Sequence, residues 1–183
     1  IEIMNPKLEK SQHSKDLIDV TLYLAGAMLM LAGKCKSIEE GMNLSEEKLA
    51  SGECFEKFIA LVEMQGGNSE LIKSPENYPK AKLSDAITAD SGGYVAGLDA
   101  LTFGLAAVNL GCGRKTVEDK IDYSSAIILN KKIGDEVHSG EVICSIHGET
   151  QAQVESTKAM ILKGIKISKD KPEIKGRIIE VIN

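Results

Sequence analysis

The amino-acid sequence predicts an α+β protein in which a helical part is followed by a part that mixes strands and helices. Three observations support this prediction. After a polar lead-in without a clear period, the apolar residues between 17 and 65 indicate helices. A polar stretch with two prolines, residues 68–82, then interrupts the pattern as a linker does. Beyond it, short apolar runs bounded by glycine-containing turns indicate strands. We therefore predict two domains, residues 1–75 and residues 76–183.

The composition excludes several classes of protein. With 183 residues the chain can form one full domain or two small ones. Its net charge of −5 argues against nucleic acid or an anionic membrane as a partner. The four cysteines lack the spacing of a metal site and are expected to be reduced thiols of a cytoplasmic protein. No secretory signal is expected, because the first residues are charged and include Pro6. The start at Ile1 rather than at Met leads us to expect a fragment.

The first helix is predicted over residues 17–32, with Gly33 as its stop. Apolar residues surround nearly its whole circumference, which is typical of a helix buried in a larger protein or of one that spans a membrane. Asp19 lies within the run, and the run falls short of the ~20 residues that a bilayer requires. We therefore expect a buried core helix.

Two further helices are predicted in the first part. One covers residues 37–50, where Ser37 is the N-cap and acidic residues occupy the first turn. The other covers residues 53–65 and ends at Gly66. Four of its apolar side chains follow the spacing i, i+3, i+4, i+7 and are expected to form core rather than a cofactor site: Phe55, Phe58, Ile59 and Val62.

In the second part, Asp99 caps a helix over residues 100–110 that Gly111 ends. Another helix is predicted over 150–163. Strands are predicted over residues 83–88, 93–98, 126–129, 142–146, 165–167 and 178–182.

The stretch after residue 110 carries the strongest sequence signal, Gly-Cys-Gly-Arg followed by a charged loop. A phosphate-binding glycine loop must open a helix, whereas this one follows a helix end, where the partial charge is negative. We therefore predict a tight turn with an ionic staple, formed by Gly111, Gly113, Arg114, Asp119 and Asp122. No catalytic, substrate-binding or metal-binding residue is assigned, because His13, His138 and His147 have no neighbouring nucleophile or carboxylate in a recognisable pattern.

An alternative function is a carrier module. Ser91-Gly-Gly-Tyr-Val95 and Gly134-Asp-x-Val137-x-x-Gly140-Glu-x-Ile143 resemble the half-motifs of biotinyl and lipoyl domains. Those domains display a modified lysine at a hairpin tip. Lys158 is the nearest candidate, but it lies some eight residues too late and within a helical pattern.

Across nearly the whole chain, the motifs resemble the pyrimidine-nucleoside phosphorylases, the thymidine phosphorylase family. The matching segments are Glu2, Met28-Leu-Met-Leu-Ala-Gly33, Ser51-Gly52, Glu56-Lys-Phe58, Gln65-Gly-Gly67, Ser91-Gly-Gly-Tyr-Val95, Leu110-Gly-Cys-Gly-Arg-Lys115, Glu118-Asp-Lys-Ile-Asp122, Asn130-Lys-Lys-Ile-Gly-Asp-Glu-Val137 and Gly140-Glu-Val-Ile-Cys-Ser-Ile-His147. Their collinear order makes the resemblance specific.

The resemblance implies the C-terminal portion of an enzyme: the last helices of an α/β catalytic domain, then an α+β "hammerhead" domain. Family members are cytoplasmic homodimers of nucleoside salvage that use phosphate to cleave thymidine, uridine or deoxyuridine into base and pentose 1-phosphate. Their phosphate loop (Lys-x-Ser-Gly-Gly type) and base-clamping residues have no equivalent in this sequence, so we expect the chain alone to be inactive.

The sequence departs from the family pattern at three places. Asn130 replaces a histidine, Cys112 replaces an alanine, and residues 4–15 follow the pattern poorly. The glutamate that binds potassium in the family would fall near Asn5, so that ligand cannot be carried over. A non-catalytic structural module descended from the enzyme is the second alternative.

Overall fold

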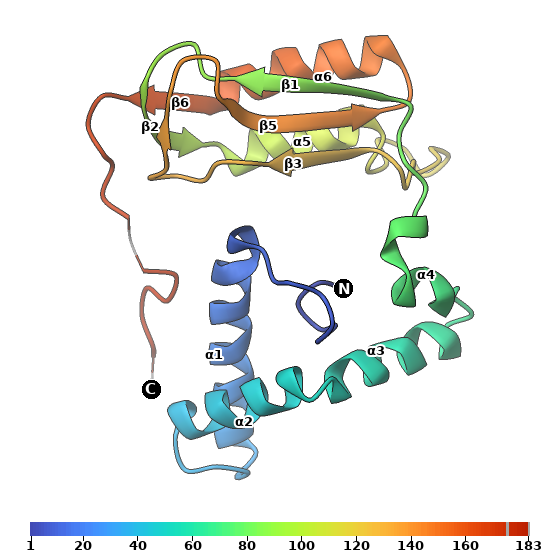
Figure 1. Ribbon diagram of the computed structural model, residues 1–183, viewed down its shortest axis with the longest axis vertical. Coiled ribbons are helices and arrows are strands. Elements are labelled where there is room, and N and C mark those ends of the chain that lie inside the picture. The colour runs from blue at the N-terminus through green and yellow to red at the C-terminus, as the bar shows by residue number, and fades with distance from the viewer. Residues whose placement is uncertain (175, 183) are drawn as a thin grey trace. The chain divides into compact units, whose positions relative to one another are not determined.

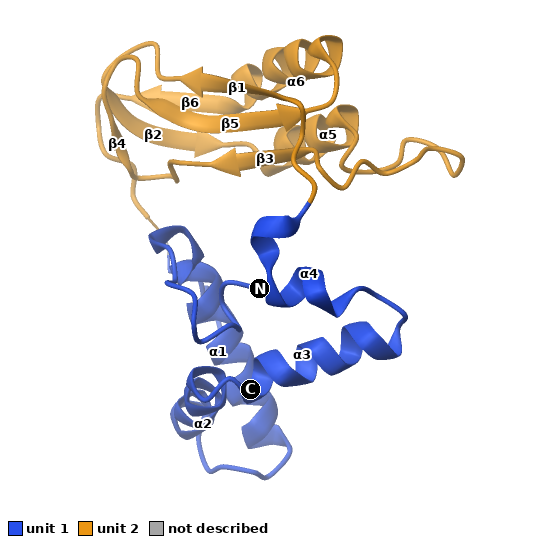
Figure 2. Cartoon of the chain, turned by 45° about the vertical axis from the view of Figure 1, so that its right-hand side comes forward, with its two compact units in different colours: residues 1–78, 176–183 blue, residues 79–175 orange. Residues whose placement is uncertain are grey.

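Figure 1 shows the computed structural model of the chain, which describes residues 1–174 and 176–182. The chain divides into two compact units (Figure 2). The first unit comprises residues 1–78 together with the end of the chain from Gly176, and the second comprises residues 79–175. The domains predicted from the sequence, 1–75 and 76–183, stay a prediction. The boundary between the two compact units lies after residue 78, three residues beyond the predicted domain boundary.

The first unit is helical. Its elements are η1 (Gln12–Ser14), α1 (Lys15–Leu31), α2 (Ile38–Ala50), α3 (Glu53–Met64), α4 (Ser69–Lys73) and η2 (Pro75–Asn77). The predicted helix ends are confirmed: Ser37 accepts a hydrogen bond from the amide of Glu40 at 3.1 Å, and Gly33 adopts a left-handed φ of 67° after α1. The linker predicted over residues 68–82 instead contains α4, whose N-cap Asn68 accepts a hydrogen bond from the amide of Glu70.

Helices α1 and α2 approach so closely that only glycine fits at their crossing. A Cβ atom on Gly26 would lie 2.5 Å from the carbonyl oxygen of Ile38, and one on Gly41 would lie 2.5 Å from that of Gly26. The predicted face of α3 forms the small core of this unit, in which Phe55 and Ile59 pack with Ile72 of α4.

Two predictions for the first unit are wrong. Among the residues described, α1 buries only Gly26, which lies where α2 packs against it. Residues 178–182 form no strand, and Arg177, which precedes them, forms an ion pair with Asp16 at 3.1 Å. In the part of the chain that the structure covers, no helix has the length and apolar character that spanning a membrane requires.

The second unit contains two three-stranded antiparallel sheets and two helices, which confirms the α+β class. One sheet has the order β1-β5-β3 and the other β4-β2-β6. The bounds are β1 (Leu83–Thr88), β2 (Gly93–Leu98), α5 (Ala100–Leu110), β3 (Ala126–Leu129), β4 (Glu136–Val137), β5 (Val142–Gly148), α6 (Gln151–Gly164) and β6 (Ile165–Ser168). The short strand β4 was not predicted, because two residues carry no periodicity.

Helices α5 and α6 pack together and close the main core of this unit over the first sheet. Residues from α5, α6, β1 and β5 meet there with almost no exposure: Ile87, Ala106, Leu110, Cys144, Ile146, Val154 and Ile161. A second cluster joins the two sheets through Ala89, Val95, Val137 and Ile143. These two clusters hold the loops described next.

Candidate functional site

The turn after α5 is a helix C-cap, as predicted. Gly111 has a φ of 111°, and the amide of Cys112 donates to the carbonyl of Ala107 at 3.0 Å, which satisfies a carbonyl at the helix end. The amide of Asp122 donates to the carbonyl of Gly111 at 2.9 Å and so closes the loop between them. A Cβ on Gly113 would press on Val108 Cγ2 at 3.0 Å. Helix carbonyls face this loop, and their partial negative charge is unfavourable for an anion such as phosphate.

Asp119 organises the middle of the loop. Its carboxylate accepts hydrogen bonds from the amides of Lys115 and Thr116 at 2.8 and 3.0 Å and from the Thr116 hydroxyl at 3.1 Å. These donors stabilise the charged form, so the Thr116 and Lys115 amides hold the pKa of Asp119 below its ordinary value. The side chain therefore builds a turn.

Asp122 anchors the end of the loop. It accepts hydrogen bonds from the hydroxyl groups of Ser125 and Ser124, and these donors lower its pKa. Ser124 Oγ also donates to Glu149 at 3.2 Å, and Glu149 forms an ion pair with Lys82 at 2.6 Å. This network ties the loop to the start of β1 and to the turn between β5 and α6.

Arg114 plays no part in this network. It is exposed, and across residues 1–174 and 176–182 it has neither a hydrogen bond nor an ion pair. The neighbouring Lys115 instead reaches back to Asn109 Oδ1 at 2.9 Å. The staple role of Arg114 therefore stays a prediction, and the loop of this chain is held by Asp119 and Asp122.

Both histidines of the second unit have a polar neighbour close in the sequence. His147 Nε2 lies 3.3 Å from the Ser145 hydroxyl on the same strand face. His138 Nδ1 lies 3.5 Å from Glu141, whose carboxylate also pairs with Lys131. Lys131 first, and then the backbone amide of His138, which donates to Glu141 at 2.9 Å, lower the pKa of Glu141 to about 2. No group of three or more His, Cys, Asp or Glu residues in the described ranges could hold a metal ion.

Lys158 is placed differently from a carrier lysine. It lies inside α6, and its ammonium forms an ion pair with Asp85 of β1 at 2.7 Å. Both side chains are about two-thirds covered, at 35% and 38% exposure. A swinging biotinyl or lipoyl arm requires a lysine at an exposed hairpin tip. The carrier alternative is therefore not favoured.

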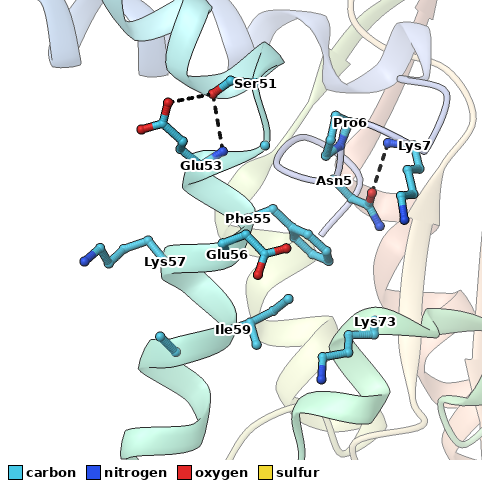
Figure 3. A pocket seen from close by; sticks show the side chains of 12 residues that line it. Asn5, Pro6, Lys7, Ser51, Glu53, Phe55, Glu56, Lys57, Ile59 and Lys73 are labelled. Atoms are coloured by element: carbon cyan, nitrogen blue, oxygen red, sulfur yellow. Dashed lines mark hydrogen bonds between the residues drawn. The ribbon is translucent and has the colours of Figure 1, made fainter.

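One cavity was not predicted. An open hollow of about 820 Å³ in the first unit lies between the lead-in residues and the start of α3 (Figure 3). Phe55 and Ile59 form its apolar wall, and the buried Asn5 accepts a hydrogen bond from the amide of Lys7 at 3.0 Å. The charged residues of its wall are Lys7, Lys57, Lys73, Glu53 and Glu56, of which Glu53 pairs with Lys48 and Lys73 with Glu70. The sequence gives no sign of this hollow, because it depends on how residues 5–7, which follow no period, fold back against α3.

The family of the chain follows from its similarity to known proteins and not from the geometry of these residues. The sequence pattern of a family described as "Pyrimidine nucleoside phosphorylase C-terminal domain" matches residues 94–168. Relatives named pyrimidine-nucleoside phosphorylase from Staphylococcus aureus strains USA300, NCTC 8325 / PS 47 and bovine RF122 / ET3-1 are each 41% identical over 142 residues. The match covers 78% of this chain and 33% of each relative, so the chain spans about a third of the length of the curated relatives it matches. The chain thus belongs, as a C-terminal portion, to the pyrimidine-nucleoside phosphorylase family.

Proposed function

We propose that this chain serves as the C-terminal part of a pyrimidine-nucleoside phosphorylase, a pentosyltransferase of nucleoside salvage. The observation that carries the proposal is the 41% identity to enzymes of that name over 78% of the chain. The substrates of the whole enzyme are a pyrimidine nucleoside, such as thymidine or uridine, and inorganic phosphate. A phosphate oxygen bonds to C1′ of the pentose as the bond from C1′ to the base breaks, giving free base and (deoxy)ribose 1-phosphate.

The role of this chain is to complete and brace the lobe that closes over the two substrates. The buried clusters of the second unit and the Asp122–Ser124–Glu149–Lys82 network support that role, because they make a rigid unit. Nucleoside and phosphate then contact the other part of the enzyme. We further propose that the whole enzyme is a cytoplasmic homodimer and binds a potassium ion through ligands outside this chain.

The test is a chimera in which this chain replaces the matching segment of the Staphylococcus aureus relative. Release of thymine from thymidine and of uracil from uridine is followed by absorbance, with and without inorganic phosphate. We expect phosphate-dependent cleavage by the chimera and none by the 183-residue chain. Robust cleavage by the chain alone, or a folded chimera without activity, contradicts the proposal.

A further inference from the structure

We draw no further inference here: the strongest candidate, the open hollow between residues 5–7 and the start of α3, carries no ligand site, because the amide of Lys7 already donates to the buried Asn5 and nothing in the described residues shows what would occupy the hollow.

Discussion

The two units of this chain bury their apolar side chains to different degrees. In the second unit, residues such as Leu110, Ile146 and Ile161 have no exposed surface, and two sheets and two helices enclose them. In the first unit, the core consists of Phe55, Ile59 and Ile72, each still 7–8% exposed.

The difference shows which unit contains its own core. A layer of secondary structure is stable when a second layer covers its apolar face. In the second unit, α5 and α6 cover the sheet that contains β1 and β5. Among the described residues of the first unit, α2 packs most extensively against α1, and Leu24, Met28 and Leu31 of α1 stay exposed. The second unit therefore encloses its own core, whereas the first unit leaves much of its apolar surface exposed.

The largest expected loss of stability comes from shortening one core side chain in each unit. Ile161→Ala leaves a dry cavity under α6 and should lower the free energy of unfolding of the second unit by about 2–5 kcal/mol. Ile59→Ala enlarges a hollow that is already open to water and should cost the first unit about 1–2 kcal/mol. Amide hydrogen exchange measured residue by residue reports each unit separately. Equal losses would contradict the difference between a closed and an open core.

Glycine-to-alanine substitutions give the next largest effect, with opposite signs in the two units. Gly41→Ala places a methyl group 2.5 Å from the carbonyl of Gly26, so it should separate α1 from α2 and cost about 1–3 kcal/mol. Gly104→Ala in α5 meets open space and should stabilise that helix by about 0.5–1 kcal/mol. Thermal unfolding followed by circular dichroism checks both signs. A neutral Gly41→Ala would show that the two helices separate easily.

The helices and strands were predictable because the residues that begin and end them are close together in the sequence. Asp99 and Gly111 fix both ends of α5 through a cap and a left-handed turn, and the expected bounds were those observed. The burial of α1 was not predictable, because it depends on which partner covers the helix and not on its own residues. In the loop after α5, the turn geometry of Gly111 followed from the sequence. The hydrogen bonds of Asp122 to Ser124 and Ser125 did not, because they depend on side-chain directions in an irregular segment.

Capping residues provide a smaller, matched comparison. Ser37 caps α2 and Thr150 caps α6, each by accepting a hydrogen bond from the amide three residues later. Replacement of either by alanine should cost about 1 kcal/mol. In the second unit only the amides in the first turn of α6 should exchange faster, because the core holds the rest of the helix in place. In the first unit, amides beyond the first turn of α2 should also exchange faster. Faster exchange beyond the first turn of α6 would argue against a second unit that encloses its own core.

The smallest expected effect is the contribution of Glu141 to the pH dependence of the second unit. The pKa of Glu141 is lowered from 4.5 to about 2 by Lys131 and the His138 amide. A carboxyl whose folded pKa is depressed contributes stability that is fully present above its unfolded pKa and is lost as the pH falls through the folded one.

The thermal midpoint of the second unit should therefore decrease as the pH is lowered from about 4.5 to about 2. Glu141→Gln keeps an acceptor for the His138 amide but removes the charge, so its midpoint should change less over that window. The exchange rates of the first unit should not differ between the two proteins, because Glu141 belongs to the second unit.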